Sequence, residues 1–151
     1  MSLEAWGDEA WGAEDGPDIE RLLGEGYRSA DDMTKAAHDV VDERLRQRDV
    51  EGWTPEHDDA HDKGELAMAA AAYAIVAALS DSRRANVSGN YSIENDGTLR
   101  YLWPWARAWW KPKTRRHDLV RAGALILAEI ERIDRAAARA AATPPASGER
   151  G

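Results

Sequence analysis

Residues 66–79 form the longest apolar run of the chain, and at least half of them are alanine. A helix that is apolar on every side is buried on every side, so this run predicts a central helix surrounded by other elements. Its small alanine side chains would let neighbouring helices approach closely. A membrane-spanning helix needs about 20 apolar residues, and this run is shorter.

Two further stretches carry apolar side chains at helical spacing. A helix over residues 32–49, capped by Ser29 or Asp31, would bury one face, which consists of Met33, Ala37, Val40, Val41 and Leu45. A last helix over residues 114–142 has a heptad-like apolar seam that is expected to pack against neighbours, made of Leu119, Gly123, Ile126, Ile130 and Ile133.

The segments on either side of the central helix carry turn and capping signals. Asp62, followed three residues later by Glu65, predicts an acidic variant of the capping box at the start of the central helix. Residues 91–101 contain Asn95-Asp96-Gly97 and predict a short hairpin or an irregular loop. The expected fold class is mostly α, a small helical bundle of three to four helices, with one short β-hairpin near 91–101.

Charge is distributed unevenly along the chain. The formal net charge of −8 resides entirely in residues 1–32, so the remainder is formally neutral. We expect residues 1–31 to be an acidic, disordered arm, residues 32–140 a helical domain, and residues 141–151 a disordered tail. The chain has no cysteine, which excludes disulfides and thiolate zinc sites. No secretory leader opens it, so a cytoplasmic location without membrane contact is expected.

The first candidate site is residues 53–65, where His57 and His61 stand among several carboxylates. Such a mixture could bind magnesium or manganese, directly or through a phosphate. The alternative is structural, because acidic residues before a helix cap its free N–H groups and favour its dipole.

The second candidate site is residues 102–117, where four tryptophans alternate with basic residues. Pro104 would start a short helix with Trp105 and Trp109 on one face. Indole rings beside lysine and arginine could stack a base and neutralise phosphate. The alternative is that at least two of the four indoles are core residues of a chain that contains no phenylalanine. Duplex DNA is not an expected partner, because the basic band is short and the acidic arm repels phosphate.

The amino-acid sequences of both segments resemble those of a group of small phage and prophage proteins. The matching stretches are EGWTPEHDD at 51–59, GEL at 64–66, LWPW at 102–105, WWKP at 109–112 and DLVRAGALILAEIER at 118–132. Members of that group are mostly uncharacterised, so the resemblance implies a phage protein in the host cytoplasm and no particular activity.

The order of the parts is also similar to the MazG-like all-α nucleoside triphosphate pyrophosphohydrolases. That resemblance implies magnesium held by a Glu-x-x-Glu pair on the central helix and a Glu-x-x-Asp pair on a later one. Glu131 and Asp134 have the later spacing. The central helix departs from the pattern, because Met68 and Ala69 follow Glu65 where a carboxylate is needed. Catalysis would then be lost or rebuilt from residues 57–65.

No nucleophile elbow, Walker loop or dinucleotide-binding glycine motif occurs in the chain. Polar, aromatic and basic residues concentrate in the two candidate segments, so our leading hypothesis is a non-enzymatic accessory protein, of the phage type that the resemblance implies. It would bind a small phosphorylated ligand such as a nucleotide, or a host protein. The alternatives are a metal-dependent nucleotide hydrolase and an inhibitor of a host defence enzyme. A homodimer is plausible because of the small-residue helices. The candidate ligand-binding residues are Trp53, His57, Asp58, Asp59, His61, Glu65, Trp105, Trp109, Trp110, Lys111, Arg115 and Arg116.

Overall fold

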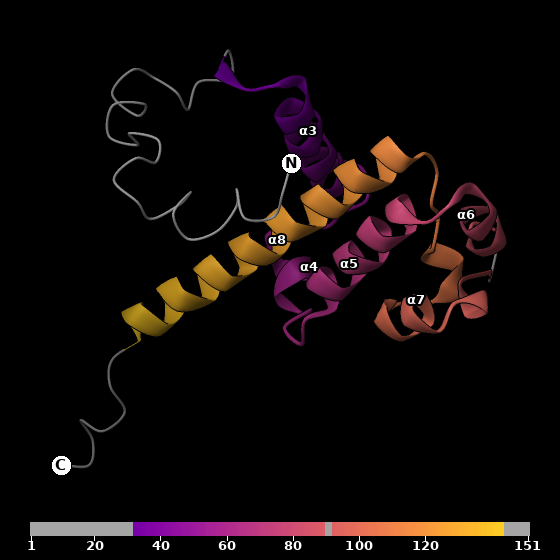
Figure 1. The fold of residues 1–151 in the computed structure, drawn as a ribbon. Coiled ribbons are helices and arrows are strands. Elements are labelled where there is room, and N and C mark those ends of the chain that lie inside the picture. The colour runs from indigo at the N-terminus through magenta and orange to yellow at the C-terminus, as the bar shows by residue number, and fades with distance from the viewer. Residues whose placement is uncertain (1–31, 90–91, 144–151) are drawn as a thin grey trace, which may run out of the picture. The chain divides into compact units, whose positions relative to one another are not determined.

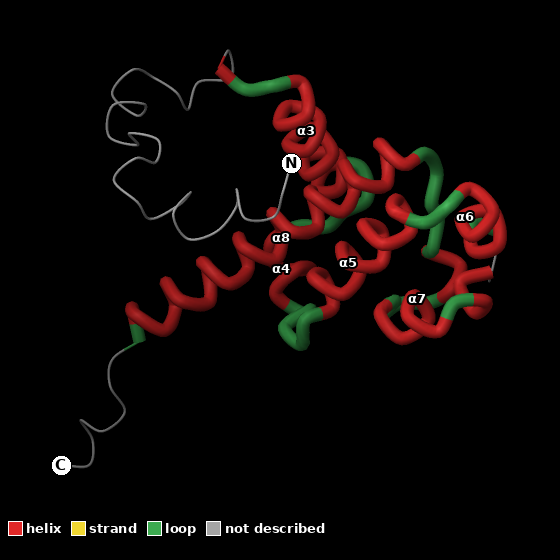
Figure 2. The backbone as a smooth tube through the Cα atoms, viewed as in Figure 1, coloured by secondary structure: helices red, strands yellow, loops and turns green. Residues whose placement is uncertain are grey.

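The computed structural model describes residues 32–89 and 92–143, and every regular element in them is a helix. The mostly α class is therefore confirmed. The α-helices are α3 (Lys35–Asp49), α4 (Pro55–Asp59), α5 (Glu65–Ala78), α6 (Asp81–Val87), α7 (Gly97–Leu102) and α8 (Arg115–Ala142), shown in Figures 1 and 2. Chain contacts divide the protein within α3, into a first unit of residues 1–38 and a second unit of residues 39–151. The predicted arm and residues 144–151 of the predicted tail lie outside the described residues.

Helices α5 and α8 lie side by side and form the centre of the second unit (Figure 1). The central helix α5 has half of its residues buried, among them Leu66, Tyr73 and Val76. Burial is incomplete because Ala67 and Ala78 are exposed, so the prediction of burial on every side was too strong. No helix in the described ranges is both long and apolar enough to cross a bilayer.

Helix α8 turns its alanine-rich face toward α5, and this reverses the predicted packing. Its buried residues include Ala122, Leu125 and Ala128. The bulky residues of the predicted seam are about half exposed, with values of 53% for Leu119, 48% for Ile126, 49% for Ile130 and 50% for Ile133. Small side chains on both helices allow a close approach that isoleucine would prevent.

Helix α3 also buries a face other than the predicted one. Its buried residues are the polar Glu43, Arg44 and Gln47, whereas Val41 and Leu45 are exposed. The start of the helix differs as well, since Thr34 Oγ1 accepts a hydrogen bond from the Ala37 N–H within the first unit and the helix begins at Lys35. The cap predicted at Ser29 or Asp31 lies outside the described residues.

The hairpin predicted at 91–101 is wrong for the described residues 92–101. A 3-10 helix covers Ser92–Asn95, and Asp96 then caps α7 by accepting a hydrogen bond from the Leu99 N–H at 2.9 Å. The turn-forming Asn-Asp-Gly sequence therefore starts a helix. Ile93 and Leu99 are fully buried, so burial of these two side chains selects the helical conformation.

The start of α5 differs from the predicted capping box. Its N-cap residue is Gly64, at φ 86°, a left-handed conformation that glycine adopts without strain. Glu65 Oε1 accepts a hydrogen bond from the Lys63 N–H at 2.7 Å, and Asp62 does not cap the helix.

Candidate functional site

A cavity of about 490 Å³ opens between the segment 103–111 and residues of α3, α4, α5 and α8. It joins the two candidate segments of the sequence. The described residues that line it are Arg46, Gln47, Glu51, Trp53, His57, His61, Tyr73, Trp103, Trp105, Ala106, Trp109, Lys111, Arg121 and Leu125.

The short helix α4 positions the two histidines. Thr54 Oγ1 accepts a hydrogen bond from the His57 N–H at 3.2 Å, and Pro55 occupies the first turn, where its missing N–H costs nothing. The Trp53 N–H donates to the Gln47 carbonyl at 2.9 Å, which ties the start of α4 to the end of α3. Both contacts fix the direction in which the rings of residues 53, 57 and 61 enter the cavity.

Four aromatic side chains on one side of the cavity form a cluster in which each ring contacts two of the others. Trp53 stacks on His57 with 5.7 Å between ring centroids and an interplanar angle of 4°. His57 meets His61 at 4.8 Å, His61 meets Trp105 at 5.6 Å, and Trp105 returns to Trp53 at 5.9 Å. This aromatic cluster offers a ligand in the cavity both flat π surfaces and imidazole edges.

Two other indoles of the second segment belong to the core. Trp103 Nε1 donates to the Ala106 carbonyl at 3.1 Å, and Trp110 Nε1 donates to the Val87 carbonyl at 2.7 Å. Both rings are buried and pack on Tyr73. The interpretation that at least two of the four indoles are core residues is therefore confirmed. The short helix predicted from Pro104 is absent, since only Arg107–Trp109 is helical there, as a 3-10 turn.

Two basic residues meet at the cavity without a carboxylate partner among the described residues. Arg121 Nη1 donates to the Tyr73 hydroxyl at 2.8 Å and to the Lys111 carbonyl at 2.9 Å. The Lys111 ammonium lies 5.9 Å from the Trp109 ring centroid. The one carboxylate among the described lining residues, Glu51, already pairs with Arg46 at 2.9 Å. Among the described lining residues Lys111 and Arg121 therefore add positive charge, which the nearby Glu43 carboxylate offsets in part at Arg121.

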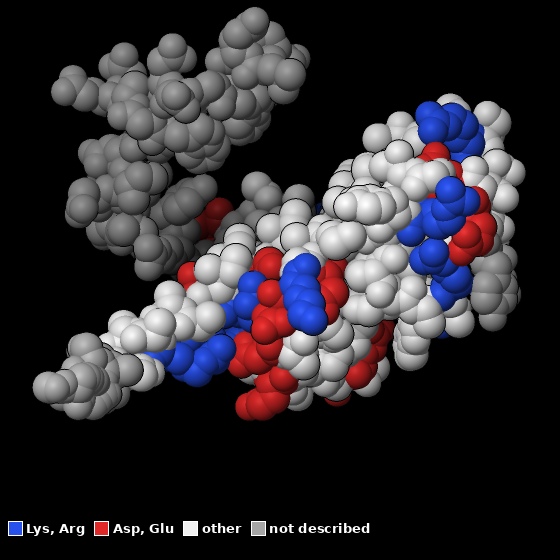
Figure 3. Space-filling view, turned by 90° about the horizontal axis from the view of Figure 1, so that it is seen from below, with Lys and Arg blue, Asp and Glu red and all other residues white. Residues whose placement is uncertain are grey.

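Most other arginines of the described residues form ion pairs with carboxylates. Figure 3 shows acidic and basic side chains side by side on the face that it presents. Ion pairs of this kind include Arg135 with Asp59 and Arg132 with Glu129.

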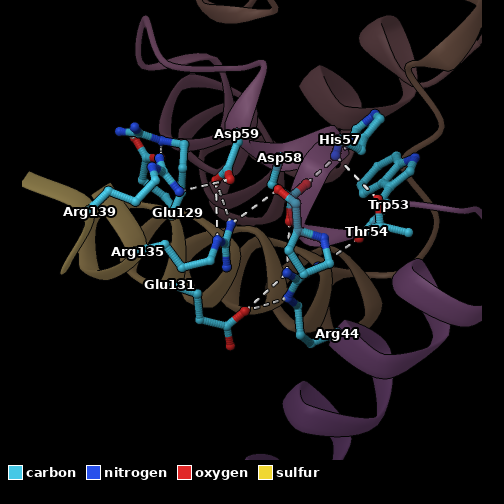
Figure 4. A network of polar contacts seen from close by, with 12 residues as sticks. Arg44, Trp53, Thr54, His57, Asp58, Asp59, Glu129, Glu131, Arg135 and Arg139 are labelled. Atoms are coloured by element: carbon cyan, nitrogen blue, oxygen red, sulfur yellow. Dashed lines mark hydrogen bonds and ion pairs between the residues drawn. The ribbon is translucent and has the colours of Figure 1, made fainter. Parts of the chain in front are cut away.

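Asp58 serves the fold and lies outside the cavity lining. Its fully buried carboxylate accepts a hydrogen bond from Arg44 Nη2 at 2.7 Å and lies 3.1 Å from His57 Nδ1 (Figure 4). Arg44 also contacts Glu131, the residue that the pyrophosphohydrolase resemblance would assign to a metal, at 3.0 Å. Asp58 orients His57 and joins α4 to α3.

Asp59 and Glu65 are likewise engaged in structural contacts. The hydrogen bond from Arg135 is the main cause that lowers the pKa of Asp59, and Arg139 adds to it (Figure 4). Burial raises the pKa of Glu65, but hydrogen bonds from its own N–H, the Lys63 N–H and His61 together bring it below its ordinary value. No group of three or more His, Cys, Asp or Glu side chains in the described parts of the chain is placed to hold a metal ion.

Half of the twelve predicted site residues line the cavity, namely Trp53, His57, His61, Trp105, Trp109 and Lys111. The other half lie elsewhere: Asp58, Asp59, Glu65, Trp110, Arg115 and Arg116. Arg115 donates to the Ala77 and Leu79 carbonyls at the end of α5, and Arg116 pairs with Asp39 at 2.8 Å. These six side chains support the fold around the cavity.

Sequence reasoning missed Arg46, Gln47 and Arg121, which line the cavity from α3 and α8. A signal was present on α3, because the polar residues at 43, 44 and 47 share one helical face. We instead expected this helix to bury the face that carries its valines and leucine.

Comparison of the chain with family models, curated proteins and solved structures gave no match. The resemblances to phage proteins and to MazG-like enzymes remain predictions, as do the hydrolase and the inhibitor of a host defence enzyme.

Proposed function

We propose that the protein binds a small ligand that combines a planar ring with a phosphate group, such as a nucleotide, in the cavity between residues 53–61 and 103–111. The observation that carries this proposal is the meeting of Lys111 and Arg121, without carboxylate partners among the described residues, at an aromatic cavity. Indole and imidazole rings stack planar ligands, and the two cations balance an anion.

The size of the cavity supports a small ligand. Ligand pockets measure about 300–1,000 Å³ and combine apolar walls with a few polar groups. The volume of about 490 Å³ lies in this range. A phage-type accessory role without catalysis is compatible with such binding and is proposed together with it.

Isothermal titration calorimetry with nucleoside mono- and triphosphates and cyclic nucleotides, with and without magnesium, tests the proposal. We expect saturable binding by at least one member that weakens as salt rises. Lys111→Ala should weaken binding about tenfold, a typical loss for one charge-assisted contact. Lys113→Ala is the matched control, since Lys113 lies two residues away outside the cavity lining.

Trp109→Ala provides a second test with little risk to the fold, because Trp109 is 62% exposed. The variant should keep its thermal unfolding temperature and bind the ligand less tightly. Absence of binding across the whole panel would overturn the proposal.

A further inference from the structure

Gln47 contributes an unsatisfied polar atom to the wall of the cavity. Its side chain is only 1% exposed, and its Nε2 donates to Glu43 Oε2 at 3.2 Å. Glu43 receives two hydrogen bonds from Arg46, at 2.7 and 2.8 Å, which hold it as a carboxylate that can only accept. The orientation of the Gln47 amide is thereby fixed, and Oε1 is the atom left without a partner.

Trp105 contributes the opposite chemistry. Its Nε1 is buried and has no hydrogen-bond acceptor, and an indole N–H can only donate. Buried polar groups without partners are rare and unfavourable. Both residues line the cavity, but the two atoms themselves are covered, so a ligand that offers one N–H donor and one acceptor supplies the missing partners only after a small displacement of the surrounding atoms.

We propose that the ring bound in the cavity is the base of a nucleoside monophosphate, with an N–H that donates to Gln47 Oε1 and an acceptor for Trp105 Nε1. This inference rests on the proposed function and adds the class of ligand. Nucleobases carry donors and acceptors on one planar edge, whereas a plain aromatic ring carries neither.

The charge of the cavity points to a monophosphate. One phosphate group carries about −1.5 to −2 at neutral pH, which Lys111 and Arg121 offset in part, because Arg121 also interacts with the Glu43 carboxylate. A triphosphate would bring more negative charge than these two side chains neutralise. Solvent reaches neither Gln47 Oε1 nor Trp105 Nε1 in the structure, so binding of the base includes a small displacement of the atoms that cover them.

Calorimetric titration of the full chain with AMP, GMP, CMP, UMP and 1-naphthyl phosphate, in the presence of EDTA, tests the inference. The naphthyl compound keeps the planar ring and the phosphate but has no N–H. We expect at least one nucleotide to bind about tenfold or more tightly than naphthyl phosphate, as one satisfied buried hydrogen bond provides. Equal affinity for all five would overturn the base assignment and leave the proposed function standing. Absence of binding by all five would overturn the inference, and the proposed function would then depend on the triphosphates and cyclic nucleotides of the wider panel.

Gln47→Met tests the residue itself, because methionine has a similar length and no hydrogen-bonding amide. The substitution should bring the affinity for the nucleotide down to that for naphthyl phosphate, and it should change the affinity for naphthyl phosphate by less than about twofold. An equal loss for both ligands would contradict the role of Gln47. Trp105→Phe, which keeps an aromatic ring and removes the N–H, should also reduce the nucleotide advantage. The comparison on the unaltered chain decides the inference even where a variant fails to fold.

Discussion

Two buried Arg–Asp pairs organise the second unit at the level of single residues. Arg44 binds Asp58 at 2.7 Å and Arg84 binds Asp118 at 3.0 Å, with both carboxylates fully buried. Arg84 further donates to the carbonyls of Val76 and Lys113. The first pair joins α3 to α4, and the second joins α6 to α8.

Asp58→Asn should destabilise the protein by about 3 kcal/mol, because it leaves the buried Arg44 without its buried counter-charge. Glu131→Gln is the matched control, since it removes the other, half-exposed partner of the same arginine and should cost less than about 1 kcal/mol. Urea unfolding of the two variants measures the difference. Equal losses would show that the buried pair has no special role.

The pH dependence of stability should include a contribution from Glu43. Burial alone would raise the pKa of this carboxyl, but hydrogen bonds and charge from Arg46, with help from Arg121 and Gln47, set the pKa below its ordinary value of 4.5. A carboxyl whose pKa is lower in the folded state stabilises the fold above its unfolded pKa, and that stabilisation disappears as pH falls through the folded pKa.

Urea midpoints of the unaltered chain and of Glu43→Gln, measured from neutral pH down to about pH 3, test this expectation. The gap between the two proteins should be largest above pH 4.5, the ordinary value, and should close as the carboxyl is protonated. Other carboxyls with lowered pKa, such as Asp59 and Asp96, are present in both proteins and cancel in the comparison. A gap independent of pH would refute the role of the ionised carboxyl.

At the level of elements, periodicity identified the long helices but not the faces that they bury. The three long helices α3, α5 and α8 lie where the sequence predicted helices. The buried face of α8 was predicted wrongly, because alanines of α8 pack against the alanine-rich α5 and the isoleucines of α8 stay about half exposed. The short helices α4 and α7 were missed because capping by Thr54 and Asp96 starts them in segments too short for a periodic pattern.

Neighbouring positions on α8 provide a direct test of its orientation. Leu125→Ala should cost about 2–5 kcal/mol, because this side chain is 1% exposed and its loss leaves a cavity. Ile126→Ala should cost less than about 1 kcal/mol, because Ile126 is 48% exposed. Both losses are measured by urea unfolding.

Equal losses for the two α8 variants would mean that the seam is covered in solution. A rise of the unfolding midpoint with protein concentration would then show that copies of the chain associate. The homodimer stays a prediction until that measurement.

At the level of the whole molecule, half of the residues that the sequence predicted for the site line the cavity. The residue types at 53–61 and 103–111 indicated ring stacking and anion binding, and the structure brings both segments to one cavity. Sequence spacing did not show which carboxylates form ion pairs with arginine, because the arginine partners lie far away along the chain. Asp59, for example, meets Arg135 across 76 positions.

The distribution of charge over the whole chain should oppose binding of an anion. Residues 1–32 carry the entire formal charge of −8, whereas the remainder is neutral. These charges are tethered to the domain that contains the cavity, so we expect them to lower the local concentration of an anionic ligand within about a Debye length. Salt screens this effect, with a Debye length of about 30 Å at 0.01 M and about 10 Å at 0.1 M.

Deletion of residues 1–32 should therefore raise the affinity for a nucleoside monophosphate several-fold at about 0.01 M salt and leave it unchanged at about 0.5 M. Calorimetry at both salt concentrations measures the effect. A full-length variant with the acidic residues of this segment replaced by their amides is the control, and it should behave as the deletion does because charge alone is responsible. A deletion that lowers the affinity at both salt concentrations would instead show that residues 1–32 contact the ligand directly.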